Sequence, residues 1–376
     1  MIDRLKVATI VGTRPEVIRL SRVITTLRKD CDHTLIHTGQ NYDYELSKVF
    51  FEDLELASPD IQLQTARSTA IQTIAAVLTE TEACLRTLSP HAVLVLGDTN
   101  SGLAVLAARR LGIPTFHMEA GNRCFDPRVP EEINRRLIDH TADINMPYSQ
   151  IARSYLIHEG IPAHRIIVTG SPMREVLNHY RPKIDSSNIL ERLNLSPRHF
   201  YVVSLHREEN VDDSASLRRF LDIFNTIANE HGLPLVVSTH PRTRTRLEKI
   251  DIQLHPNIHL MNPLSFSDYV NLQIQSRAVL SDSGTLSEEA AILKLRAINL
   301  RESHERPEAM EEAAAIMVGS NRERILQALQ IMNDDKLTDY VPETPVDYQN
   351  IHVSQKVCRI IHSYVDSARS RAISWC

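Results

Sequence analysis

One stretch decides the fold class: Thr115-Phe116-His117-Met118-Glu119-Ala120-Gly121, followed by Pro130-Glu131-Glu132. The apolar run Ile113–Phe116 is typical of a buried parallel strand. It leads directly into Glu119, which puts a carboxylate at the end of the strand, where open α/β sheets bind ligands. Most charge clusters are solvated salt-bridge loops. A solvated loop, however, does not require an acid at the end of an apolar strand.

The composition is that of an ordinary globular protein, with 24% charged and 42% apolar residues. A chain of 376 residues exceeds what one hydrophobic core usually supports, so two domains are expected. The net charge of −5 gives no electrostatic footprint for nucleic acid. No apolar run approaches membrane-spanning length and no signal peptide is recognisable, so we expect a cytoplasmic protein that does not contact a membrane.

The cysteines are odd in number and scattered: Cys31, Cys84, Cys124, Cys358 and Cys376. None stands in a Cys-x-x-Cys pair. This pattern argues against a disulfide framework and against a zinc site, and it fits a reducing cytoplasm.

Strand and helix patterns alternate along the chain. Predicted strands are Lys6–Val11, Thr34–His37, Ala92–Leu96, Thr115–Met118, Ile144–Met146, Ile166–Thr169, Phe200–Leu205, Leu233–Ser238, Ile258–Leu260, Ala278–Ser281 and Ala297–Leu300. Predicted helices are Val17–Lys29, Tyr44–Phe51, Thr69–Leu88, Ser101–Arg110, Glu131–Thr141, Ser149–Glu159, Ser216–Asn229, Phe266–Gln275, Leu286–Leu293 and Ile351–Arg369. Such alternation predicts right-handed βαβ units and parallel sheets.

A polar stretch, Tyr180–Arg198, divides the alternation into two Rossmann-like series. We therefore expect an α/β protein with an N-terminal domain over 1–175 and a C-terminal, nucleotide-binding domain over 176–354. Two such domains imply a cleft between their facing strand ends.

Unusual residues follow the predicted strands, in Gly12-Thr13-Arg14-Pro15-Glu16, Gly97-Asp98-Thr99-Asn100, His206-Arg207-Glu208-Glu209-Asn210, His240-Pro241-Arg242 and Ser281-Asp282-Ser283-Gly284-Thr285. The first and last precede helices, so their backbone N–H groups suit an anion such as a diphosphate. Neither is a Gly-x-Gly-x-x-Gly fingerprint, which disfavours NAD. Taken singly, Asp98 is a candidate helix N-cap, and each histidine could be a loop residue with its hydrogen bonds satisfied and no role in binding. Together, the loops favour one shared site.

Six of the motifs together resemble the non-hydrolysing UDP-N-acetylglucosamine 2-epimerase family over nearly the whole chain. They are Gly12-Thr13-Arg14-Pro15-Glu16, Gly97-Asp98-Thr99, Glu119-Ala120-Gly121, Pro130-Glu131-Glu132, Asp282-Ser283-Gly284 and Glu305-Arg306-Pro307-Glu308. The resemblance implies a glycosyltransferase-B-type fold, an active site in the cleft, and no NAD or metal cofactor. It also implies that the last helix, about 355–376, packs back on the N-terminal domain. A UDP-sugar is the expected partner, and we expect a homodimer.

Several positions differ from the pattern of family members that act on UDP-N-acetylglucosamine. Asn122-Arg123-Cys124 replaces Leu-Arg-Thr, Gly170-Ser171-Pro172 replaces Gly-Asn-Thr, and a family lysine is Arg19. These variants resemble the family branch of the UDP-N-acetyl-L-fucosamine pathway. That branch inverts C2 of UDP-2-acetamido-2,6-dideoxy-L-talose and supplies a capsule and O-antigen sugar. The alternative within the family is UDP-N-acetylglucosamine itself, which gives UDP-N-acetylmannosamine.

The chemistry limits the residues that are needed. The proton on C2 of the sugar is not next to a carbonyl, so its simple removal would leave a carbanion of high energy. Eliminating UDP across C1–C2 avoids this carbanion, because the leaving diphosphate takes the negative charge. This requires acids that exchange protons near C2 and groups that hold UDP between the two steps. The predicted catalytic set is Asp98, Glu119, Glu131 and His206. The predicted substrate and UDP contacts are Arg14, Arg19, Arg135, His240, Ser283, Gly284, Thr285, Glu289 and Arg306.

Two other classes remain open on the residues alone. A glycosyltransferase of the same fold binds a UDP-sugar but needs an acceptor and no acid cluster. A non-catalytic UDP-sugar sensor needs Ser283 and Gly284 but not three acids. The acid cluster favours the epimerase.

Overall fold

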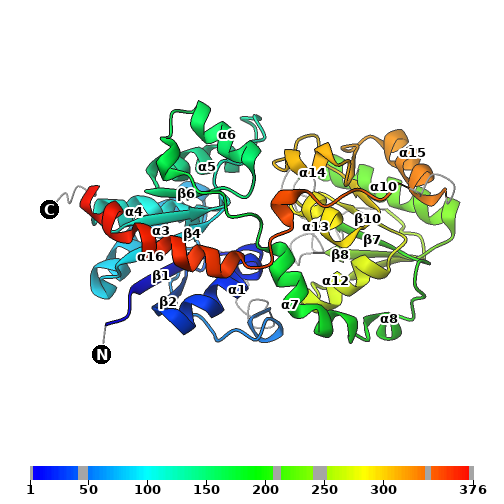
Figure 1. Cartoon of the computed structure of the whole chain (residues 1–376). Helices are drawn as coiled ribbons and strands as arrows, with labels where there is room; N and C mark the ends of the chain where they lie inside the picture. The colour runs from blue at the N-terminus through cyan, green and yellow to red at the C-terminus, as the bar shows by residue number, and fades with distance from the viewer. Residues whose placement is uncertain (1–2, 41–49, 206–212, 240–251, 335–339, 372–376) are drawn as a thin grey trace. The chain divides into compact units, whose positions relative to one another are not determined.

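Each half of the chain builds its own six-stranded parallel sheet within the residues that the structure describes. The computed structural model describes residues 3–40, 50–205, 213–239, 252–334 and 340–371. Unit 1 comprises Met1–His179 and Val346–Cys376, and unit 2 comprises Tyr180–Pro345. The sequence places the corresponding domain boundaries at 175/176 and 354/355. The predicted α/β class with two Rossmann-like parallel sheets is confirmed (Figure 1).

The sheet of unit 1 has the strand order β3-β2-β1-β4-β5-β6. Its strands are β1 Lys6–Val11, β2 Asp32–His37, β3 Ile61–Gln62, β4 Ala92–Leu96, β5 Thr115–Met118 and β6 Ile144–Met146. Every neighbouring pair is parallel. The chain therefore leaves β1 toward one edge of the sheet and β4 toward the other. The gap between β1 and β4 is the topological switch point where such sheets bind ligands.

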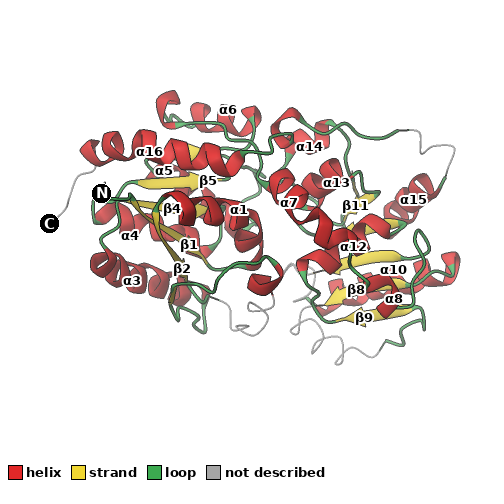
Figure 2. Cartoon of the chain, turned by 60° about the horizontal axis from the view of Figure 1, so that its bottom comes forward, coloured by secondary structure: helices red, strands yellow, loops and turns green. Residues whose placement is uncertain are grey.

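Helices flank the sheet strands of unit 1 (Figure 2). They are α1 Arg14–Asp30, α3 Ala70–Leu88, η1 Asn100–Leu103, α4 Ala104–Arg110, α5 Pro130–Thr141, α6 Gln150–His158 and η2 Ala163–Arg165. In α1, Val17, Leu20 and Ile24 recur at helical spacing and are buried. Their burial keeps the start of α1 at the end of β1.

The sheet of unit 2 has the order β12-β11-β10-β7-β8-β9, with every neighbouring pair parallel. Its strands are β7 Tyr201–Leu205, β8 Leu235–Thr239, β9 Ile258–Met261, β10 Ala278–Ser281, β11 Ala297–Asn299 and β12 Ile316–Met317. Its helices are α8 Ile189–Arg192, α10 Ser214–His231, α12 Phe266–Gln275, α13 Leu286–Leu293, α14 Pro307–Glu311 and α15 Arg322–Asn333. The switch point of this sheet lies between β7 and β10.

Two helices join distant parts of the chain. Helix α7, Met173–Asp185, includes the boundary between the units, and α16, Val353–Arg371, packs against α1 of unit 1 (Figure 1). The turn η3, Val346–Tyr348, leads into α16. Ser354 at the start of α16 donates its backbone N–H to Glu175 of α7 at 2.8 Å. This contact fixes the point at which the chain returns to unit 1.

Several sequence predictions of single elements are wrong. Ile166–Thr169 is not a strand, because the three-residue strand β6 offers it only one bridge, between Asn145 and Ile166. The polar stretch predicted as a linker begins inside α7, which accommodates Pro182 within the helix. The two-residue edge strands β3 and β12 and the helix α15 have no counterpart in the prediction. Most of the predicted helix Tyr44–Phe51 lies outside the described residues.

None of the helices in the described part of the chain is both long and apolar enough to span a bilayer.

The packing of α16 generates a stability prediction. Ile361 is 0% exposed, whereas Ile351, just before the helix, is 44% exposed. We expect Ile361→Ala to lower the free energy of unfolding by about 2–5 kcal/mol, because it removes buried methylenes and leaves a cavity. Ile351→Ala is the matched control and should change it by less than about 0.5 kcal/mol. Chemical denaturation measures both. Equal losses for the two variants would contradict the burial of this face of α16 against unit 1.

Candidate functional site

Glu119 follows β5 directly and stands at the carboxyl end of that strand. Its φ is +64°, in the left-handed region that costs a non-glycine residue roughly 1–3 kcal/mol. Its buried Oε2 is paired with the guanidinium of Arg19 from α1. Asn122 Nδ2 donates to Oε1 at 3.2 Å, and the Tyr148 hydroxyl donates to Oε2 at 3.4 Å. A strained backbone and three side chains thus fix one buried carboxylate.

Asp98 follows β4, the strand beside β5, and side chains of α5 hold it. Arg135 donates to Asp98 Oδ2 through both Nε, at 3.1 Å, and Nη2. Asn134 Nδ2 donates to the backbone carbonyl of Asp98 at 3.0 Å. The N-cap of the following 3-10 helix is Thr99, whose hydroxyl accepts from Ser101 N–H, so the interpretation of Asp98 as an N-cap is wrong. The Asp98 carboxylate instead pairs with Arg135.

Glu131 lies in the first turn of α5 and is half-buried. It precedes Arg135 by four residues, so the two share one face of the helix. Because Arg135 contacts Asp98, this face of α5 is directed toward the end of β4. The structure therefore places Asp98 and Glu119 at the carboxyl ends of β4 and β5, with Arg135 and Arg19 as their respective partners. The place of Glu131 beside these acids stays a prediction.

Glu16 is a fourth acid, which the sequence presents only as part of a turn. It is 2% exposed and accepts from the N–H groups of Gly12 and Thr13 at 2.8 and 2.7 Å. The Thr13 hydroxyl donates to the same oxygen at 2.9 Å, and the Thr99 hydroxyl donates to the other at 2.8 Å. Burial raises the pKa of Glu16 to about 7, although these hydrogen bonds lower it. The Thr-x-x-Glu capping-box pattern is the signal that could have revealed it.

A buried ionic network supports the loop after β5. Asp139 of α5 lies 2.9 Å from His117 Nδ1 and accepts from Arg123 Nη1 at 2.8 Å. It also accepts from the N–H of Gly121 at 3.1 Å, while His117 Nε2 donates to the carbonyl of Gly97 at 2.8 Å. All three charged or titratable side chains are 0% exposed. The network fixes the loops that carry Asp98 and Glu119 from within the unit, and sequence reasoning missed it.

In unit 2, the turn after β10 and the start of α13 form a compact hydroxyl cluster. Ser283 Oγ and Thr285 Oγ1 lie 3.0 Å apart, and Thr285 Oγ1 donates to Glu289 Oε1 at 2.8 Å. Gln273 Nε2 donates to the other oxygen of Glu289 at 2.9 Å. The turn stands at the switch point of its sheet and precedes a helix, a position that suits an anion. Gly284 lies within it.

The other residues predicted to contact the substrate or UDP do not belong to the clusters described above. The guanidinium of Arg14 stacks over the ring of Phe50 at 4.2 Å, at the start of α1. Arg306 is 2% exposed, and its Nε lies 3.3 Å from Glu288 Oε2 inside unit 2. His206 and His240 lie outside the described residues.

The pKa of Glu16 generates a pH prediction. A carboxyl whose folded pKa is raised from 4.5 to about 7 destabilises the folded state increasingly as pH rises through this range. Glu16→Gln keeps the shape but does not ionise. The parent should therefore lose up to about 3 kcal/mol of unfolding free energy relative to this variant between pH 4.5 and pH 7, at 1.36 kcal/mol per pKa unit.

Denaturant titrations of both proteins at pH 5 and pH 8 measure this difference. The comparison with the variant cancels the other titrating groups. A stability difference that is the same at both pH values would show that Glu16 does not titrate in this range.

Comparison with known proteins agrees with this geometry. Residues 25–362 match the model of the UDP-N-acetylglucosamine 2-epimerase family. The structure of UDP-N-acetylglucosamine 2-epimerase from Rickettsia bellii is 44% identical, with a TM-score of 0.90 over 98% of this chain and 99% of that one. The Methanocaldococcus jannaschii enzyme, solved in complex with UDP-GlcNAc and UDP, is 33% identical, with a TM-score of 0.89 over 96% and 100%.

A relative from Pseudomonas aeruginosa is named for a different substrate. UDP-2,3-diacetamido-2,3-dideoxy-D-glucuronate 2-epimerase is 34% identical over 86% of this chain and 91% of its own length. Both the matched residues and the two sheets thus extend over nearly the whole protein, which has the glycosyltransferase-B-type fold. The chain belongs to the UDP-N-acetylglucosamine 2-epimerase family, a family of isomerases.

Proposed function

We propose that this chain inverts C2 of a UDP-2-acetamido sugar by eliminating UDP and adding it back. A carboxylate removes the C2 proton while the C1–O bond breaks and its electron pair leaves with UDP. The C2–H electron pair becomes the C1–C2 double bond of a 2-acetamidoglycal. In the return step, UDP attacks C1 and a proton reaches C2 from the opposite face.

The observation that carries this proposal is the pair of arginine-held acids on adjacent strands of unit 1. Because C2 loses its proton on one face and gains a proton on the other, the reaction requires two proton-exchanging groups at different positions. Asp98 and Glu119 come from the ends of β4 and β5, and each is held by its own arginine. Glu131, on the Arg135 face of α5, is the third member of the proposed set. Positioned acids and bases of this kind typically contribute about 10²–10⁴-fold in rate.

UDP must stay bound between elimination and re-addition. We assign its diphosphate to the turn formed by Ser283, Gly284 and Thr285, because N–H groups and hydroxyls there precede a helix. Glu289, held by Thr285 and Gln273, is the proposed partner of the ribose hydroxyls. The assignments of Arg14 and Arg306 to UDP stay predictions. The expected homodimer also stays a prediction.

Two substrates are candidates. The names of the Rickettsia and Methanocaldococcus proteins favour UDP-N-acetylglucosamine. The Pseudomonas relative, of almost equal identity to the second of these, is named for a UDP-diacetamido-glucuronate, so identity near 34% does not decide the substrate within this family. The branch that acts on UDP-2-acetamido-2,6-dideoxy-L-talose is the second candidate, although none of these three relatives is named for that substrate. One structural observation bears on the residues that would make this choice.

The observation concerns the loop after Glu119. Asn122 donates to Glu119, and the N–H of Cys124 donates to Glu132 Oε2 at 3.1 Å. Glu132 in turn accepts from Arg135 at 2.8 Å, the arginine that holds Asp98. Positions 122 and 124, which differ from the Leu-Arg-Thr pattern of the D-gluco enzymes, are therefore coupled to both acids. This coupling supports a role for the loop in substrate choice.

The mechanism predicts the fate of the C2 proton. Turnover of the parent in deuterated water should place deuterium at C2 of the product, as detected by mass spectrometry. Asp98→Asn, Glu119→Gln and Glu131→Gln should each lose about two to four orders of magnitude in turnover per folded protein. Binding of UDP, measured by calorimetry, should remain because none of the three acids is a proposed UDP contact.

Glu80→Gln is the matched control, since Glu80 of α3 forms a partly exposed ion pair with Arg67 and is not a proposed catalytic or UDP contact. It should keep the turnover of the parent. Three amide variants within about tenfold of the parent would mean that the acids form a structural ionic cluster.

The loop predicts a shift in substrate choice. Turnover of the D-gluco and L-talo UDP-sugars is measured side by side for the parent and for Asn122→Leu. The ratio of kcat/KM should move toward UDP-N-acetylglucosamine in the variant by at least about tenfold, the scale of one altered pocket contact. The ratio for the parent assigns the substrate. An unchanged ratio would exclude Asn122 as a determinant.

A further inference from the structure

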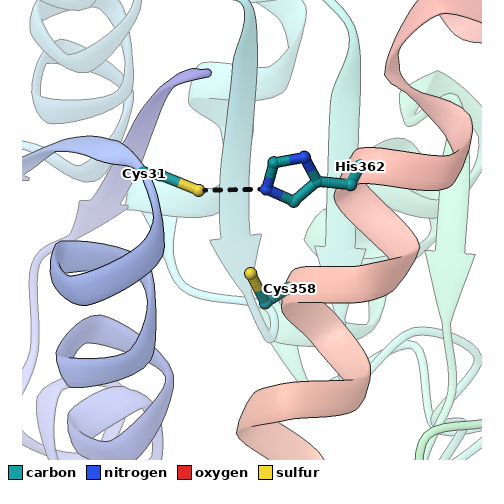
Figure 3. A group of neighbouring side chains, drawn as sticks. All are labelled: Cys31, Cys358 and His362. Carbon is teal, nitrogen blue, oxygen red and sulfur yellow. Dashed lines mark hydrogen bonds between the residues drawn. The ribbon is translucent and has the colours of Figure 1, made fainter. Parts of the chain in front are cut away.

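Three metal-ligating side chains meet where α16 crosses the end of α1 (Figure 3). Cys31 is the C-cap of α1, and Cys358 and His362 lie on α16. Their sulfur and nitrogen atoms all lie within 4.8 Å of one another. The chain positions are far apart, which is why the spacing of the cysteines predicted no such group.

The distance between Cys31 Sγ and His362 Nε2 matches that of two ligands around a tetrahedral cation. Zinc binds sulfur at about 2.3 Å and imidazole nitrogen at about 2.0–2.1 Å, so S and N ligands at tetrahedral angles are about 3.6 Å apart. Cys31 Sγ and His362 Nε2 are 3.5 Å apart. Cys358 and His362 are separated by four residues, so both project from one face of the helix.

The surroundings permit an ion to enter. Cys31 and Cys358 are buried free thiols, while His362 is exposed. Cys31 also borders a surface hollow that is lined by Arg4, His33 and His91 among others. The cluster supplies three protein ligands, so the fourth position of a tetrahedral ion would fall to water.

We propose that Cys31, Cys358 and His362 bind one zinc-type divalent cation, with water as the fourth ligand. Thiolate and imidazole ligands in tetrahedral geometry favour zinc among the common divalent ions. The cation would connect α16 to the junction of α1 and β2. Cys31 precedes β2 and thus lies at the amino ends of the strands, whereas Asp98 and Glu119 follow the carboxyl ends of theirs. The site therefore acts on the stability of unit 1 and not on the proposed C2 chemistry.

Zinc binding to the purified full chain tests this proposal. After chelation and reduction, the parent is titrated with Zn²⁺ in competition with a chromophoric chelator. We expect one Zn²⁺ per chain at this site, and a weakening of at least about tenfold in Cys31→Ser, Cys358→Ser and His362→Ala. Zn²⁺ should also raise the thermal midpoint of the parent, because it binds the folded state. Co²⁺ should give a thiolate charge-transfer band in the parent that is weaker in each cysteine variant, which keeps one thiolate.

Cys84→Ser and His352→Ala are the matched controls, since neither residue belongs to the cluster. Both should retain the Zn²⁺ affinity of the parent. His362 is exposed, so His362→Ala tests the site even if a cysteine variant does not fold. Equal Zn²⁺ affinity and equal thermal midpoints in the parent and His362→Ala would overturn the proposal. Formation of a Cys31–Cys358 disulfide under mild oxidation, without Zn²⁺ binding, would also overturn it and would indicate a redox pair.

Discussion

The carboxylate of Glu16 connects the loop after β1 to the loop after β4, which are far apart in the sequence. At the switch point, β1 and β4 are neighbours whose following segments run toward opposite edges of the sheet. Glu16 accepts hydrogen bonds from Gly12 and Thr13 after β1 and from Thr99 after β4. These bonds hold the loops together, and Asp98 stands directly before Thr99. The geometry of the acids therefore depends on a buried group that is not itself assigned to proton transfer.

Each proposed acid on the strand ends is held by an arginine, and this arrangement constrains the chemistry. Arg19 holds Glu119, and Arg135 is shared between Asp98 and Glu132. A buried carboxylate without such a partner would carry a large desolvation cost. A guanidinium fixes the position of the carboxylate as well as its charge. In the proposed mechanism the arginines preorganise the acids, so that little reorganisation would be needed when the C2 proton moves.

The alternation of apolar runs was sufficient to predict both parallel sheets, since buried parallel strands read as continuous apolar segments. The acids at strand ends were also visible, because each interrupts such a run. What the sequence could not supply were the partners. Arg19 and Glu119 are 100 residues apart, and Arg123 pairs with Asp139 on the next helix. Helix α7 was also missed, and it contains Pro182 in its last turn, where a proline reads from sequence as a helix breaker.

The requirement for glycine at position 121 has a consequence for protein engineering. A Cβ at this position would lie 2.5 Å from the carbonyl oxygen of Ala152, and its φ is +80°, so glycine is required. Arg123 is equally fixed by its buried ion pairs. A library aimed at new sugar acceptance should therefore leave 121 and 123 unchanged and randomise 122, 124 and 125. Phe125 is the most exposed of these three, at 61%, but its φ of +55° restricts which side chains fit there.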